Sequence, residues 1–115
     1  SGERGPVDVT TSIQTVLTLY ENQLKRGVTL DVQLTPDLEL NADADALSQV
    51  WTNLIQNAIQ AMRGRGRMWI IAEPLPDARI RVVIGNDGPS IPEDIRVRIF
   101  EAFFTTKAVG ENTPR

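Results

Sequence analysis

One segment without a charged residue, 46–62, constrains the fold of this chain more than any other. It reads ALSQVWTNLIQNAIQAM, and its apolar residues recur every three or four positions, which predicts a helix with one broad apolar face. Helices that face bulk water usually carry Lys and Glu, so this helix is unusual for a protein surface. The residues of its apolar face are Leu47, Val50, Trp51, Leu54, Ala58 and Met62.

A strip of side-chain amides runs beside that apolar face. Asn53, Asn57 and Gln60 are four and three residues apart, so they project side by side from a helix. Amides offer hydrogen-bond donors and acceptors without charge, which suits a partly dry cleft for a charged ligand, or a cation that prefers oxygen ligands. The same amides can also satisfy neighbouring backbone groups or face solvent. Spacing alone leaves these alternatives open.

The segments before this helix predict another helix and two strands. Apolar residues at helical spacing predict a helix over 10–26, with Thr10 or Thr11 as its N-cap. Strict alternation of apolar and polar residues predicts a strand over 28–34. A shorter strand is expected around residues 38–40.

The segments after the uncharged helix predict two strands and a short helix. Asp43 or Asp45 can cap the N-terminus of the uncharged helix itself. Two further strands are expected over 68–73 and 79–85, joined by a proline-containing turn. A short helix is expected to begin at Pro92, since proline is favoured at a first helical position.

This order of elements predicts an α/β fold, a two-layer α/β sandwich in which a mixed β-sheet carries helices on one face. We expect residues 1–115 to form a single domain, with 105–115 as a mobile tail. Trp51 and Trp69 are expected in its core.

The composition excludes several classes of function. Twelve basic and 15 acidic residues give a net charge of −3, which argues against nucleic-acid or membrane-surface binding as the main activity. The chain has no cysteine and no histidine, so it has no cysteine nucleophile and lacks the commonest general base and the commonest metal ligand. No apolar run approaches the roughly 20 residues that span a bilayer, and no signal peptide is visible. We therefore expect a cytoplasmic location.

The segment VVIGNDGPSIPEDI, residues 82–95, raises a second question. An apolar run ends in Gly-Asn-Asp-Gly-Pro, which is typical of a turn and equally of a loop that glycine opens for a ligand. Taken alone, Asp87 is the obvious candidate for chemistry in this segment.

Together, the two segments resemble the ATP-binding catalytic domain of sensor histidine kinases, within the superfamily that also holds DNA gyrase, MutL and a heat-shock chaperone. QVWTNLIQNAIQAM resembles the N box of that family, and NDGPSIP stands where its first glycine box is expected. IFEAFFTTK resembles its F box and the start of the ATP lid. The resemblance covers roughly residues 7–110 and implies a Bergerat-type ATP-binding fold with ATP and Mg²⁺ as cofactors.

The resemblance also implies roles for individual residues. Asn57 would coordinate, through its amide oxygen, the Mg²⁺ that bridges the nucleotide phosphates. Asn53 would hydrogen-bond a phosphate or a metal-bound water, and Gln60 stands where many members carry a basic phosphate contact. Ala61 would lie near the adenine pocket. Lys107, in the lid, would reach the terminal phosphate or lie in solvent.

Alignment with the glycine box places Gly88 and Ile91 in register. Asn86 then takes the place of the adenine-binding aspartate, where it can still accept from the adenine amino group and donate to the ring nitrogen beside it. Ser90 takes the place of the second glycine, which is unfavourable if that backbone needs positive φ or close ligand approach. Asp87 falls on a variable position and is expected to point away from the base.

The function implied by the resemblance is phosphoryl transfer. The γ-phosphoryl of ATP would pass to a histidine on a separate dimerisation domain of the same protein, and then to an aspartate of a response regulator. The ATP-hydrolysing branches carry a glutamate base where this chain has Asn53, and an amide cannot take up the proton, so transfer is favoured over hydrolysis.

Departures from the family pattern keep two alternatives open. Asn86, Ser90 and Gln60 favour a degenerate binding or regulatory module of the same fold, and an anti-sigma-factor serine kinase shares the same boxes. The second glycine box is absent, so we expect a truncated domain with no catalytic residue of its own, weak or no nucleotide binding and no activity alone. Neither nucleic acid nor direct membrane contact is expected, although other domains could tether it to the inner membrane.

Overall fold

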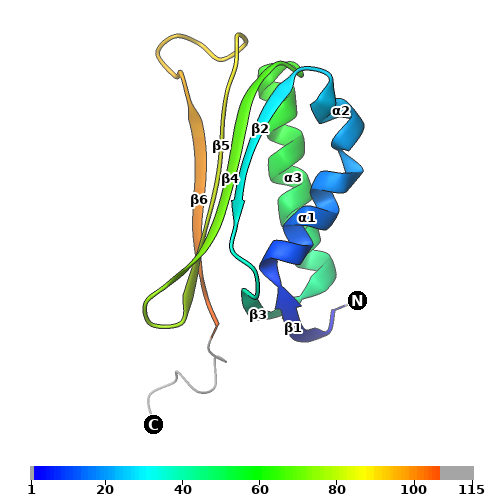
Figure 1. The fold of residues 1–115 in the computed structure, drawn as a ribbon, viewed down its shortest axis with the longest axis vertical. Coiled ribbons are helices and arrows are strands. Elements are labelled where there is room, and N and C mark those ends of the chain that lie inside the picture. The colour runs from blue at the N-terminus through cyan, green and yellow to red at the C-terminus, as the bar shows by residue number, and fades with distance from the viewer. Residues whose placement is uncertain (1, 107–115) are drawn as a thin grey trace.

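The computed structural model describes residues 2–106, which form one layer of β-sheet and one layer of helices (Figure 1). Within the described residues, no helix is long and apolar enough to cross a membrane. The elements in chain order are β1 (Arg4–Asp8), α1 (Val9–Leu19), α2 (Glu21–Lys25), β2 (Val28–Leu34), β3 (Glu39–Asp43), α3 (Ala44–Met62), β4 (Gly66–Leu75), β5 (Arg79–Asp87) and β6 (Arg98–Thr105).

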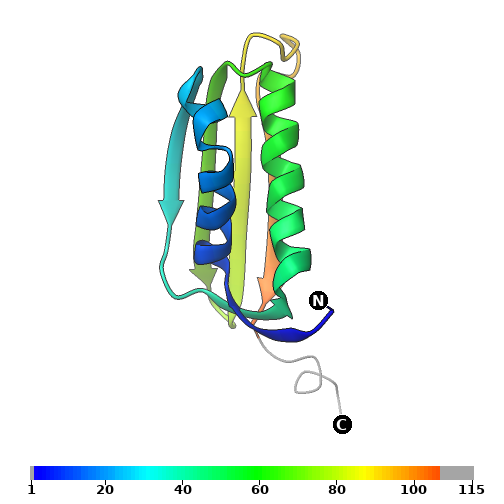
Figure 2. The same cartoon turned by 90° about the vertical axis from the view of Figure 1, so that its right-hand side faces the viewer.

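The main sheet contains four strands in the order β2-β4-β5-β6. Strand β2 is parallel to β4, whereas β4, β5 and β6 run antiparallel to their neighbours, so the sheet is mixed. Strands β1 and β3 form a separate antiparallel pair, which lies at the lower end of the molecule in Figure 1. Figure 2 shows α1 and α3 side by side over one face of the sheet. The predicted two-layer α/β sandwich with a mixed sheet is therefore confirmed.

Helix α3 forms as its periodicity predicts, and its ends explain its length. The carboxylate of Asp43 accepts hydrogen bonds from the backbone N–H groups of Asp45 (3.0 Å) and Ala46 (3.3 Å), so Asp43 is the N-cap. Arg63 ends the helix in the left-handed conformation, with φ at 54°. Trp51 is fully buried between the layers, which confirms its predicted place in the core.

The predicted helix over 10–26 is two helices. The chain leaves helical geometry at Tyr20, with φ −102° and ψ 9°, and this residue separates α1 from α2. The N-cap position is Asp8, so the prediction of Thr10 or Thr11 is wrong. The Thr11 hydroxyl instead donates a hydrogen bond to the Asp8 carboxylate at 2.6 Å. Helix α1 therefore begins at Val9, whereas the predicted helix began at residue 10.

The prediction of a helix from Pro92 is also wrong. A single turn, in which the Ile95 N–H donates to the Pro92 carbonyl at 2.8 Å, leads instead into strand β6. Burial alternates along β6, and Phe104 on the helix side packs its ring edge against Trp51, with centroids 6.1 Å apart. Aromatic and branched side chains on both faces favour a strand here. Most of the predicted tail, from Lys107 onward, lies outside the described residues.

The sheet face opposite the helices carries Trp69, so its predicted place in the core is wrong. Along β4, Met68 and Ile70 take the helix side and are fully buried, whereas Trp69 between them is half-buried on the other side. Its ring covers Gly85 on the neighbouring strand, where an added Cβ would lie 2.3 Å from the indole. Glycine at 85 therefore makes room for the tryptophan.

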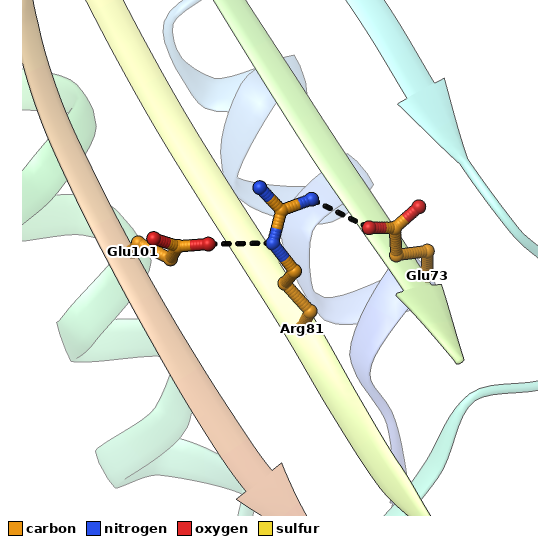
Figure 3. Close-up of polar contacts among 3 residues, drawn as sticks. All are labelled: Glu73, Arg81 and Glu101. Atoms are coloured by element: carbon orange, nitrogen blue, oxygen red, sulfur yellow. Dashed lines mark hydrogen bonds and ion pairs between the residues drawn. The ribbon is translucent and has the colours of Figure 1, made fainter. Parts of the chain in front are cut away.

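A charged trio crosses the same face of the sheet (Figure 3). The Arg81 guanidinium on β5 contacts Glu101 of β6 at 2.6 Å and Glu73 of β4 at 2.5 Å. The hydrogen bond from Arg81 to Glu101 is the largest of the influences that raise the pKa of Arg81, and the hydrogen bond to Glu73 is the next. This face is thus polar at its centre and apolar around Trp69.

Candidate functional site

A cleft of about 440 Å³ lies between α3 and the β5–β6 pair. Leu54, Asn57 and Ala58 line it from the helix. Its floor comes from neighbouring strand positions, because Ile84 pairs with Phe100 and Asn86 pairs with Arg98 in the antiparallel register. Ile95, Val97 and Ile99 complete the lining. The cleft is therefore apolar with a few polar side chains, the usual composition of a small-molecule site.

Asn86 is the most informative residue in this cleft. It is only 5% exposed, and its Nδ2 atom has no hydrogen-bond partner within the described part of the chain. A buried amide without a partner costs folding free energy, and such groups are rare in native proteins. The unsatisfied donor therefore indicates a ligand group that accepts a hydrogen bond at this position.

Asn57 lies across the cleft from Asn86, so α3 and β5 bring two of the predicted site residues together. The other two amides of the strip lie outside the cleft lining. Asn53 is exposed, and its Oδ1 accepts from Gln49 Nε2 at 3.0 Å, one helical turn earlier. Gln60 is exposed as well. All three amides are exposed, and of the three only Asn57 lines the cleft.

Asp87 was expected to point away from the base, and it does not line the cleft. Its carboxylate accepts from the backbone N–H of Arg67 at 3.1 Å, at the last pair of the β4–β5 ladder. It lines a separate shallow hollow, together with Gly88 and Ile91. Asn86, and not Asp87, therefore lines the cleft.

The remaining residues predicted on the glycine-box turn, Gly88, Ser90 and Ile91, are not part of the cleft lining. Ile91 is buried, and its N–H donates to the carbonyl of Gly88 at 3.1 Å. A Cβ added at Gly88 would lie 2.7 Å from the carbonyl oxygen of Arg65, which follows α3, and 3.0 Å from Cγ of Met62, the last residue of α3. Ser90 is exposed and is not among the described residues with positive φ, so serine is unstrained there.

Two further predicted residues lie away from the cleft lining or beyond the described chain. Ala61 is half-buried, and Ala58, one turn earlier, lines the cleft instead. Lys107 lies outside the described residues. The sequence did not indicate Arg98 as a site residue, because its segment was expected to follow a helix. The pairing of Arg98 with Asn86, together with the alternating burial along β6, places Arg98 on the helix-facing side. The sequence itself does not signal this, because the polar residues of 98–105 are three and four positions apart.

Residues 42–113 match the model of the histidine kinase-, DNA gyrase B- and HSP90-like ATPase family, and this match spans more than half of the chain. The chain belongs to this family. Among its relatives, the sensor protein kinase PilS of Pseudomonas aeruginosa is 31% identical over 109 residues, which cover 90% of this chain and 21% of PilS. The signal transduction histidine-protein kinase AtoS of Escherichia coli is 38% identical over 81 residues, 70% of this chain and 13% of AtoS. The chain thus spans about a fifth or less of these curated relatives.

Solved structures of the family resemble the chain in fold. The catalytic domain of histidine kinase ThkA has a TM-score of 0.70 and 30% identity, over 81% of this chain and 64% of that domain. ThkA has also been solved in complex with the response regulator protein TrrA, and that structure has a TM-score of 0.69 over 80% of this chain. The histidine kinase AdeS of Acinetobacter baumannii, at 18% identity and a TM-score of 0.74, shares the fold. The sandwich described above is therefore that of a histidine kinase catalytic domain.

Proposed function

We propose that this chain is the ATP-binding catalytic domain of a two-component sensor histidine kinase. In the intact protein it would bind Mg·ATP and present the γ-phosphoryl to a histidine on a dimerisation domain, from which the group passes to a response-regulator aspartate. The kinase names of its relatives and the response regulator bound to ThkA support this proposal. Since ATP is the donor, the proposal places the domain in the cytoplasm.

The observation that carries the proposal is the pairing of Asn86 with Asn57 in one cleft. Asn86 is buried with an unsatisfied Nδ2, so a ring nitrogen of a purine can accept from it while Oδ1 accepts from an amino group. The apolar side chains of Leu54 and Ile84 flank the position of the base. The cleft therefore fits a nucleotide base at its floor.

The residues present also fit Mg²⁺ in the way that nucleotide enzymes hold it. Among residues 2–106, no three acidic, histidine or cysteine side chains lie close enough to bind a metal ion by themselves. Mg²⁺ keeps several waters and is often bound by one or two protein oxygens plus substrate phosphates. The amide oxygen of Asn57, at the mouth of the cleft, would be that protein ligand, and the ion would neutralise phosphate charge.

The chemistry proposed for this chain is positioning rather than proton transfer. Among residues 2–106, no carboxylate lines the cleft, and the residue at position 53 is an amide that cannot act as a base for water. Phosphoryl transfer depends mainly on alignment and charge neutralisation, which this cleft can supply. The acceptor nitrogen attacks the γ-phosphorus as the bond to the departing ADP breaks.

Calorimetric titration of the intact protein with Mg·ADP tests this proposal. We expect saturable binding that Asn57→Ala weakens about tenfold or more, because the metal loses its protein ligand. Gln56→Ala is the matched control, since Gln56 is an exposed amide of the same helix that does not line the cleft. If the parent protein does not bind at millimolar nucleotide, the kinase proposal fails and the binding-module alternative replaces it.

A further inference from the structure

The cleft floor carries a polar pair, Asn86 and Arg98, of which the family resemblance assigns only Asn86. They are direct register partners on β5 and β6, so their side chains leave the sheet side by side on the face toward α3. Both line the cleft, and Arg98 is the one charged residue in its described lining. No ion-pair partner for Arg98 occurs among residues 2–106. Its guanidinium is thus available to a ligand.

The amide of Asn86 does not select one purine by itself. Adenine presents an amino group and an acceptor nitrogen on its Watson–Crick edge, whereas guanine presents a carbonyl oxygen and an N–H. A carboxylate at this position accepts only, so it can accept from the adenine amino group or from the guanine N–H, but it repels the guanine O6 beside that N–H. An amide carries both a donor and an acceptor, and a rotation of its terminal group matches it to either base. Asn86 therefore removes the discrimination that a carboxylate would give.

Arg98 adds a preference in the opposite direction. Its guanidinium offers five N–H donors and no acceptor, and it matches the O6 and N7 acceptors of guanine in a bidentate manner. Adenine offers an amino group, itself a donor, in place of O6, so it gains less from this side chain. The two neighbours on the cleft floor thus complement guanine together, with Oδ1 of Asn86 toward the ring N–H and Arg98 toward the acceptors.

We propose that this cleft accepts guanine nucleotides as well as adenine nucleotides, with Asn86 and Arg98 as the residues that determine base specificity. This inference rests on the proposed nucleotide-binding function and extends its substrate class. The buried, unsatisfied Nδ2 of Asn86 supports it, because that donor has the guanine O6 or the adenine ring nitrogen as alternative acceptors.

Titration of the intact protein with Mg·ADP, Mg·GDP and Mg·UDP tests the inference. The three ligands share their phosphates and metal, so differences among them report base recognition. We expect the dissociation constants for Mg·ADP and Mg·GDP to lie within about tenfold of each other, and Mg·UDP to bind about tenfold or more weakly. Asn86→Asp should weaken Mg·GDP about tenfold or more relative to Mg·ADP, because the carboxylate cannot donate to O6.

A second variant, Arg98→Lys, keeps the charge and removes the bidentate fork. It lies at an exposed position, so folding should be preserved even if the buried Asn86→Asp change unfolds the protein. We expect it to weaken Mg·GDP more than Mg·ADP. Equal weakening of all three nucleotides would assign Arg98 to the phosphates and overturn its role in base recognition.

The remaining outcomes separate this inference from the proposed function. If Mg·ADP binds better than Mg·UDP while Mg·GDP does not, the cleft is specific for adenine, and only the inference is overturned. If neither purine nucleotide binds, the proposed function fails, and the inference fails with it.

Discussion

Gly88→Ala is predicted to destabilise the domain, because the turn that follows β5 packs directly on the end of α3. A Cβ at residue 88 would lie 2.7 Å from the Arg65 carbonyl oxygen and 3.0 to 3.1 Å from the Met62 side chain. The nearest of these atoms belongs to the backbone, which cannot rotate away, and Met62 is fully buried. The glycine is therefore required by packing, whatever the ligand.

The magnitude follows from two opposing effects. Overpacking in a well-packed region costs about 1–3 kcal/mol. Replacing glycine by alanine restricts the unfolded chain and returns about 0.4–1 kcal/mol, since Gly88 is not in the left-handed region. We expect a net loss of about 1–2 kcal/mol, or about 5–10 °C in the midpoint of thermal unfolding for a domain of this size.

Thermal unfolding followed by circular dichroism measures this effect. Gly5→Ala is the matched control, because no atom lies within 4 Å of a Cβ built at residue 5. The control should match the parent or unfold at a slightly higher temperature. If Gly88→Ala is as stable as the control, the close packing of this turn on α3 is refuted, and ligand approach becomes the better explanation for the glycine.

Two further predictions concern charged side chains. Asp8→Ala should cost about 1 kcal/mol at neutral pH, because the partly exposed carboxylate loses hydrogen bonds from the Thr11 hydroxyl and the Leu38 N–H. The Thr11 hydrogen bond is the main cause that lowers the pKa of Asp8 in the folded state, so this contribution is present above the unfolded-state pKa and lost as pH falls through the folded-state pKa. Chemical denaturation should show the difference between parent and variant shrink in acid, and a pH-independent difference would contradict it. Glu101→Gln should leave the unfolding midpoint nearly unchanged, because exposed ion pairs contribute little, and a loss as large as that of Gly88→Ala would contradict this expectation.

The elements with strong local signals were predictable from the sequence. Helix α3 and strand β2 have clear periods of 3.6 and 2 residues, and the Asp43 cap is a local hydrogen-bonding pattern. Strand β1 was not predicted, because its sequence Arg-Gly-Pro-Val-Asp has little strand propensity and forms through pairing with distant β3. Local patterns contain no information on such non-local partners.

The same limit applies to the candidate site. The pairing of Asn57 with Asn86 was predictable because each residue lies in a recognisable motif. Trp69 was misplaced because MWIIAE is apolar on both faces, and its alternation alone does not say which face the helices cover. Arg98 was missed because its role depends on the register of β6 against β5, which places it beside Asn86.

The most direct test of the central claim is nuclear magnetic resonance of the Asn57 and Asn86 side-chain amides in the intact protein, labelled selectively at asparagine. Addition of Mg·ADP should shift both amides, and replacement of Mg²⁺ by paramagnetic Mn²⁺ should broaden Asn57 more than Asn22, an exposed residue of α2. Mn²⁺ without nucleotide should have little effect, because the nucleotide phosphates, together with Asn57, are what hold the metal ion in the cleft. If nucleotide leaves Asn57 and Asn86 unchanged while other asparagines shift, the cleft between α3 and β5 is not the nucleotide site.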